Sequence, residues 1–139
     1  MDGETWRLYG LVAGGGALGS LLRAALSTPV PSGAFPWSVF GINVAGSLLI
    51  GVLLTLALEA ARMGAEVRVF LSTGVLGGFT TFSTFAGQVA GLLQTAPVVA
   101  AAYAIGSIVA GVAAALAGQA AVRALWLRRG DGRQEEEAG

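Results

Sequence analysis

The sequence predicts an all-α integral membrane protein with four transmembrane helices, the third of which is broken in the middle of the membrane. Three observations predict this fold. Of the 139 residues, 55% are apolar and only 12% are charged, a balance typical of chains that lie in lipid. Between Leu8 and Leu127 charged residues are rare, and most of the others lie near the two ends. Helix breakers and short polar segments separate four long apolar stretches.

The first two apolar stretches are expected to be continuous spans. Residues 8–26 would form a helix of about 28 Å, which matches the hydrocarbon thickness of a bilayer. Residues 27–36 contain three prolines and a glycine, so they should form a loop. The second span is expected at residues 37–58, and the charged loop 59–66 should follow it.

The third span is expected at residues 67–93, with an interruption at residues 77–80. As one helix this stretch would be about 40 Å long, which is more than a bilayer core needs. Gly74, Gly77 and Gly78 lie near its centre and supply the interruption. We therefore predict two half-helices that meet inside the membrane.

The fourth span should begin after Pro97 and cover residues 98–127. Residues 1–127 then form one four-span membrane domain. Residues 128–139 contain Gly130, Gly132 and a run of three glutamates, and this composition predicts a disordered charged tail.

Residue types that are missing from the chain exclude several functions. There is no Cys, His or Lys, which removes disulfides, thiolate and imidazole metal sites, histidine bases and Schiff-base lysines. No Asp or Glu lies within a span, so a small multidrug exporter that depends on a membrane carboxylate is disfavoured. An intramembrane enzyme is the least favoured class. No basic patch indicates a nucleic-acid partner.

The densest polar cluster lies at the predicted break, between Gly74 and Phe85. It carries hydroxyls at Thr81, Ser83 and Thr84, and at Thr80 just before them. A broken helix in lipid frees backbone groups, which need protein, water or an ion as partners. Hydroxyls that bond back to a kinked helix are the alternative, but four of them in five residues exceed what a kink needs.

Phe82 and Phe85 are three residues apart and should share one helix face. The edge of an aromatic ring is electropositive, so two such edges could meet an anion without a fixed charge. Two phenylalanines at this spacing are more often packing residues. Their position beside Thr81, Ser83 and Thr84 weakens that alternative here.

Further polar residues lie within the other spans. Asn43 and Ser47 share a face of the second span, and Tyr103 and Ser107 share a face of the fourth. The amide of Asn43 offers two donors for an anion, although contact between helices is an equal alternative for this residue. Arg23 is the one charge well inside a span, so it should either mark a pore entrance or reach the membrane surface as an anchor. Such donors, without membrane acids, favour a small, strongly hydrated anion.

These residues together resemble the fluoride channel family (CrcB, or Fluc), which consists of small four-span proteins that protect microbes from fluoride. The resemblance covers most of the chain, from Gly14 to Ser107. Its most specific stretch is Gly74-Val-Leu-Gly-Gly-Phe-Thr-Thr-Phe-Ser-Thr-Phe85. Other matching residues are Gly15, Gly19, Arg23, Phe35, Pro36, Trp37, Asn43, Gly46 and Ser47.

The resemblance implies a fluoride-selective channel in the cell (inner or plasma) membrane, which exports cytoplasmic fluoride passively. In the family, two subunits pack antiparallel and enclose two pores. Backbone carbonyls that match Gly77 and Thr80 would hold a structural sodium ion at the dimer centre. The implied pore residues are Asn43, Thr81, Phe82, Ser83, Thr84, Phe85, Tyr103 and Ser107, with Arg23 at the entrance.

Three positions depart from the family pattern. Val39 stands where relatives usually carry Thr, Gly111 where they commonly have a hydroxyl, and Gln88 where many have Glu. These departures bear on whether both pores are complete.

The arginines give a prediction about orientation and partner. Seven of the eight lie on the side of the termini and of loop 59–66, so the positive-inside rule favours cytoplasmic termini. An antiparallel homodimer needs both orientations, whereas such a bias also fits one subunit of a heterodimer. A non-conducting assembly subunit, held by stripes of small residues such as Gly15 and Gly19, remains a further alternative. The same stripes equally fit packing within one chain.

Overall fold

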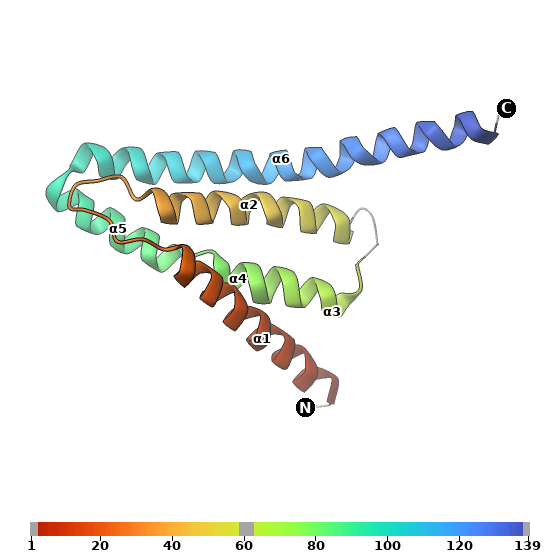
Figure 1. Cartoon of the computed structure of the whole chain (residues 1–139), viewed down its shortest axis with the longest axis horizontal. Helices are drawn as coiled ribbons and strands as arrows, with labels where there is room; N and C mark the ends of the chain where they lie inside the picture. The colour runs from red at the N-terminus through yellow and green to blue at the C-terminus, as the bar shows by residue number, and fades with distance from the viewer. Residues whose placement is uncertain (1–2, 59–62, 138–139) are drawn as a thin grey trace.

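The computed structural model describes residues 3–58 and 63–137, so the first residues of the expected loop 59–66 lie outside it. Every regular element in these ranges is helical (Figure 1). The described residues contain four helical stretches long and apolar enough to cross a membrane, which confirms the predicted count. The elements are α1 (Gly3–Leu26), α2 (Trp37–Leu58), α3 (Ala65–Arg68), η1 (Val69–Leu76), α4 (Gly77–Phe79), α5 (Phe82–Thr95) and α6 (Pro97–Glu137).

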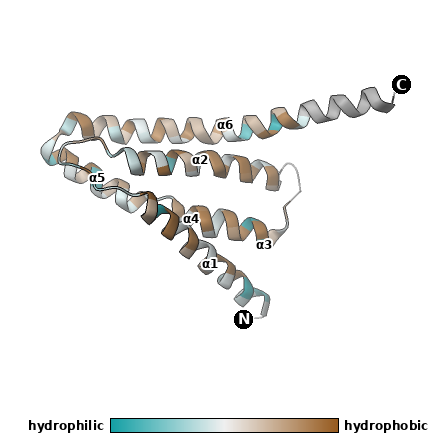
Figure 2. Cartoon of the chain, viewed as in Figure 1, coloured by the Kyte–Doolittle hydropathy of each residue, from teal (hydrophilic) through white to brown (hydrophobic). Residues whose placement is uncertain are grey.

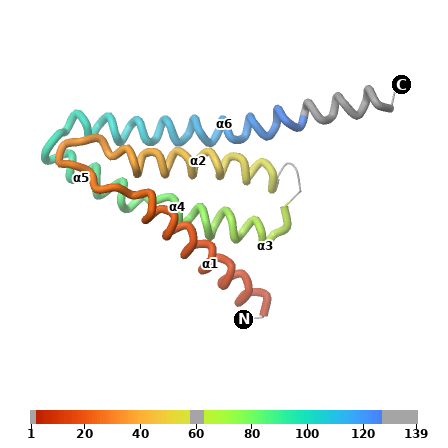
Figure 3. The backbone as a smooth tube through the Cα atoms, in the orientation of Figure 1, coloured from red at the N-terminus to blue at the C-terminus, as the bar shows by residue number. Residues whose placement is uncertain are grey.

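The four spans form two pairs. Helices α2 and α6 run side by side in the same direction, while α1 lies obliquely against η1 and α4 (Figure 3). The chain enters α1 and leaves α6 at one end of the bundle, and loop 27–36 lies at the other end (Figure 1). This arrangement is the one that four membrane crossings require. Apolar residues dominate all four spans, and hydrophilic residues appear near the start of α1, at α3, in α5 and towards the end of the coloured part of α6 (Figure 2).

Glycines allow α1 to approach the third span at backbone distance. A Cβ added to Gly15 would lie 2.9 Å from Gly74 Cα, and one added to Gly19 would overlap the carbonyl oxygen of Val75. At the same interface, a Cβ added to Gly78 of the third span would overlap the carbonyl oxygen of Gly16 on α1. Small residues at such an interface increase van der Waals contact between helices. The stripe on α1 therefore serves packing within the chain.

The α2–α6 pair is built in the same way. A Cβ on Gly51 would overlap the carbonyl oxygen of Ala115, and one on Gly118 would overlap that of Leu48. The helices consequently pack with their backbones almost in contact, and their relative register is fixed. Other small residues, such as Gly106, have open space around them.

The third span is interrupted later than the sequence suggested. Gly77 keeps helical dihedral angles, with φ −62° and ψ −37°. The extended residues are Thr80 (ψ 156°) and Thr81 (φ −147°, ψ 118°), whereas the expected break covered residues 77–80. Glycine tolerates a helix when a neighbouring helix packs against it. Gly74 and Gly78 lie against Gly15 and Gly16 of α1, so these two glycines serve contact with α1 rather than the break itself. The preceding segment η1 is a π-helix of eight residues, which the sequence did not predict.

The C-terminal segment differs from the prediction of a disordered tail at residues 128–139. Helix α6 continues to Glu137. Once a helix has formed, each further residue that joins it adds one hydrogen bond, so extension is easier than nucleation. No proline follows Pro97 to stop this extension. Two glycines alone do not end such a helix.

Candidate functional site

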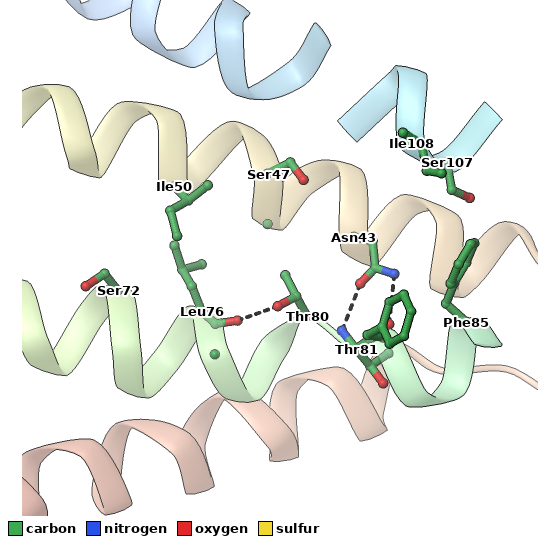
Figure 4. Close-up of a pocket in the computed structure, with 13 residues that line it drawn as sticks. Asn43, Ser47, Ile50, Ser72, Leu76, Thr80, Thr81, Phe85, Ser107 and Ile108 are labelled. Atoms are coloured by element: carbon green, nitrogen blue, oxygen red, sulfur yellow. Dashed lines mark hydrogen bonds between the residues drawn. The ribbon is translucent and has the colours of Figure 1, made fainter. Parts of the chain in front are cut away.

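An open cavity lies at the break of the third span, between α2, α6 and the two half-helices (Figure 4). Its volume is about 420 Å³. Polar groups from three spans meet apolar and aromatic side chains on its wall. The lining residues are Asn43, Gly46, Ser47, Ile50, Ser72, Leu76, Gly77, Thr80, Thr81, Phe82, Phe85, Ser107 and Ile108.

Asn43 on α2 fixes the backbone at the break. Its Oδ1 accepts from the amide nitrogen of Thr81 at 2.9 Å, and its Nδ2 donates to the carbonyl oxygen of Thr81 at 3.1 Å (Figure 4). The amide orientation follows from chemistry, because the Thr81 N–H can only donate and so must face an oxygen. Asn43 thus replaces the helical acceptor that the Thr81 amide loses, and it gives a further donor to the carbonyl of Thr81, which is the N-cap of α5. One of its two amide hydrogens remains for another acceptor.

The same contacts free the carbonyls of Gly77 and Thr80. In a helix, the Gly77 carbonyl would accept from the amide of Thr81, but that amide donates to Asn43. The Thr80 carbonyl would accept from the amide of Thr84, which donates to Thr81 Oγ1 at 3.2 Å. Both residues line the cavity. Their carbonyls are hard oxygen donors, the ligand type that an alkali or alkaline-earth cation takes, so the predicted ligand set fits such an ion.

The hydroxyls that follow the break cap helix α5. Thr81 Oγ1 accepts from the Thr84 amide, donates to Thr84 Oγ1 at 3.0 Å and lies 3.3 Å from Ser83 Oγ. This is an N-cap arrangement. Thr81 lines the cavity, whereas Ser83 and Thr84 are exposed and are not among its described lining residues. A single chain therefore does not place Ser83 and Thr84 at the cavity, although the sequence predicted both as pore residues.

Phe82 and Phe85, which the spacing predicted on one helix face, both lie at the cavity wall. Their ring centroids are 5.8 Å apart, with the planes tilted by 41°. Phe85 is half-buried and lies 5.2 Å from the ring of Tyr103. Phe82 is 79% exposed. One ring thus has a fixed position against α6, while the other is presented outward.

Tyr103 and Ser107 lie on one face of α6, but only Ser107 lines the cavity. Tyr103 is completely buried, and its hydroxyl donates to Gln88 Oε1 on α5 at 2.8 Å. Ser107 Oγ is buried and has no hydrogen-bond partner within the described ranges. Arg23 lies in the last turn of α1 and is not among the residues that line this cavity.

Several site residues were not assigned from the sequence. Gln88 was noted only as a departure, yet it is the partner of Tyr103. Gly46 lies against Thr80, whose methyl group would overlap an added Cβ. Ser47 lines the cavity beside Asn43. Its spacing from Asn43 was the available signal, since residues four apart share a helix face.

The cavity has no fixed charge among its described lining residues, since none of them is Asp, Glu, Lys or Arg. The described residues contain no group of acidic, His or Cys side chains that could hold a metal. The cavity therefore offers amide and hydroxyl hydrogens, ring edges and backbone carbonyls.

Charged side chains pair away from the cavity. A salt bridge between Arg7 and Glu66, 2.7 Å long, lies at the end of the bundle that carries the termini.

Comparison with known proteins gives a family match over residues 10–119, described as CrcB-like protein, Camphor Resistance (CrcB). A fluoride-specific ion channel FluC of Thermus thermophilus is 50% identical over 114 residues, which cover 79% of this chain and 90% of that protein. The FluC of Novosphingobium aromaticivorans is 46% identical over 118 residues, with 81% and 93% covered. That of Methanopyrus kandleri is 40% identical over 119 residues, with 85% and 91% covered.

Proposed function

The chain belongs to the CrcB/FluC family of fluoride channels, and from this premise we propose that it is a fluoride-specific channel of the cell membrane. It conducts fluoride passively, so that fluoride which ionises in the cytoplasm leaves down its electrochemical gradient. It is not an enzyme. The observation that supports this function on the residues themselves is the uncharged, donor-bearing cavity at the break.

The chemistry of the cavity suits a small anion. Fluoride is strongly hydrated, so a pathway through the membrane must offer hydrogen-bond donors in place of water. Asn43 has one amide hydrogen left, and Ser107 has a buried hydroxyl without a partner in the described chain. No described lining residue has a positive charge that would trap the anion. Phe82 and Phe85 are proposed to add electropositive ring edges along this path.

A structural sodium ion is proposed at the carbonyls of Gly77 and Thr80. Both carbonyls lose their helical donors to side chains, as the bonds of Asn43 and Thr81 require. A bound sodium ion would supply positive charge to oxygen atoms that otherwise need water in the membrane. Within the chain, the role of Gly77 and Thr80 is to hold these oxygens at the cavity wall.

A second subunit is proposed to cover the cavity. The cavity is open, it contains polar groups at membrane depth, and Phe82 beside it is 79% exposed. Lipid tails cannot satisfy such polar groups, whereas a protein surface can. The partner is a second copy in antiparallel orientation. A paired homologous subunit is the alternative, and it is favoured by the arginine bias towards the side of the termini.

Fluoride efflux from liposomes tests the proposal. Purified protein is reconstituted into vesicles loaded with fluoride, and release is followed with a fluoride electrode. The wild type should release fluoride rapidly, and the double variant F82I/F85I should lose most of this flux. Phe40→Ile is the matched control, because Phe40 packs on Phe35 and Trp37 and is not among the described lining residues.

The outcomes separate the alternatives. No efflux from the pure wild type would overturn the homodimeric channel, and recovery on adding a homologous subunit would indicate the heterodimer. Full efflux from F82I/F85I would overturn the role of the rings. A tag on the C-terminus, found on one side of the membrane or on both, separates the single-orientation subunit from the antiparallel homodimer.

A further inference from the structure

Helices α2 and α6 keep one constant register along the cavity. Gly51 lies against Ala115, and one turn earlier Ser47 lies against Gly111. In both pairs the α6 residue follows the α2 residue by the same number of positions. The two helices are parallel (Figure 1). The same offset therefore places Asn43, one turn before Ser47, at the level of Ser107, one turn before Gly111.

Gly111 leaves a gap on α6, and the hydroxyl of Ser47 faces that gap. A Cβ added to Gly111 would lie 3.3 Å from Ser47 Oγ, which is tighter than an ordinary contact. A larger residue at position 111 would therefore crowd the hydroxyl. The glycine gives Ser47 room on the cavity wall, where both Ser47 and Ser107 are found.

Most other hydroxyls on this wall are already engaged. Ser72 donates to the Arg68 carbonyl at 2.6 Å and Thr80 to the Leu76 carbonyl at 2.9 Å. Thr81 donates to Thr84 Oγ1. Ser107 Oγ, in contrast, is buried without a partner in the described chain. The large majority of buried polar groups have a hydrogen-bond partner, so we expect water or an ion to complete the bonding of Ser107.

We propose that Ser47, Ser107 and the remaining amide hydrogen of Asn43 form one binding position for a dehydrated anion, with Ser47 as the hydroxyl that α6 lacks at Gly111. The inference rests on fluoride conduction as proposed above and assigns to that path a residue on α2. Three donors from two adjacent helices replace part of the water shell of the ion. They leave the ion free to move on, because none of them is charged.

Exchange of the hydroxyl between the two helices tests the proposal in the fluoride-loaded vesicles. Ser47→Ala should lower the fluoride efflux rate about tenfold or more, the effect of losing one hydrogen bond to an ion. The double variant S47A/G111S should regain most of the rate, because removal of Ser47 Oγ makes room for a serine on α6. Gly111→Ser alone should lower the rate, since it crowds Ser47.

Thr55→Ala is the matched control. Thr55 lies two turns beyond Ser47 on the same face of α2, and its hydroxyl donates to the Gly51 carbonyl at 2.9 Å. It is not among the described lining residues of the cavity, so T55A should conduct within about twofold of the wild type. Thermal unfolding midpoints of all variants show whether a change in rate follows from folding.

Each result has one meaning. Wild-type efflux in S47A, or a folded S47A/G111S that conducts no faster than S47A, would overturn the inference. Ser47→Cys keeps the volume with a weak donor, and it decides the matter if S47A does not fold: a lowered rate supports the position, and a wild-type rate contradicts it. An inactive wild type would instead contradict the proposed function.

Discussion

The two halves of the third span are positioned by different forces. Before the break, η1 and α4 lie against α1 with their backbones nearly in contact, through Gly15 and Gly19. After the break, the start of α5 is held by side-chain hydrogen bonds from Asn43 and Thr81. Steric changes should therefore disturb the first half most, and small polar changes the second.

The largest effect should come from adding one methyl group to the first half. In Gly19→Ala the new Cβ would overlap the Val75 carbonyl oxygen and lie 2.8 Å from the Phe79 amide nitrogen. Since backbone cannot yield as a side chain does, we expect a loss of about 3 kcal/mol in the free energy of unfolding. The midpoint of thermal unfolding in detergent measures it.

Gly14→Ala is the control for this substitution. It lies on the same helix, and a Cβ there would meet nothing within 4 Å. It should be neutral or slightly stabilising, because alanine favours the helix. Equal midpoints for G19A and G14A would show that close packing with α1 does not hold the first half.

A smaller loss of stability, with a large loss of flux, is expected when Asn43 is changed. Asn43→Ala removes both hydrogen bonds to Thr81, and we expect a cost of about 1–2 kcal/mol, because such bonds between spans contribute little each. Fluoride efflux should fall strongly, since the break loses its fixed geometry. Ser20→Ala is the control: its contact with the Gly78 carbonyl in the first half is long, at 3.5 Å, and its loss should change neither quantity.

The smallest effect is expected at the cap of α5. Thr81→Ala removes the acceptor for the Thr84 amide, at a cost of about 1 kcal/mol. Amide hydrogen exchange at residues 83–85 should become faster, while exchange in η1 stays unchanged. Thr95→Ala, at the other end of α5, removes an exposed hydroxyl that donates to the Gly91 carbonyl. It should leave amide exchange at residues 83–85 unchanged. Faster exchange in both halves would mean that they are not held independently.

Much of the fold was predictable because it depends on local properties. The apolar lengths and the breakers gave the four spans, and α2 begins and ends at the expected residues, Trp37 and Leu58. The π-helical geometry of η1 was not predictable, since no residue type in Val69–Leu76 distinguishes it from an α-helix. The helical continuation of α6 to Glu137 was also missed, because composition alone says little about how far an existing helix extends.

The candidate site was predictable as a set of residues but not as a set of contacts. Asn43, Phe82, Phe85 and Ser107 were singled out by their polarity or spacing, and all four line the cavity. The sequence did not indicate which of these polar groups would be engaged by others. The pairing of Tyr103 with Gln88 depends on how α5 packs against α6, which no local pattern records.

By itself, the sequence determined that this protein crosses the membrane four times and offers donors rather than charges within its spans. Hydrophobic length and residue chemistry are properties of each segment alone. Only the tertiary structure decided where the third span breaks. The glycines could have broken it at Gly77, but α1 packs against that part of the helix, and Asn43 binds both peptide groups of Thr81. The break lies where a side chain from a distant span, Asn43, replaces the helical acceptor of the Thr81 amide, because a backbone group inside the membrane needs a partner that lipid cannot supply.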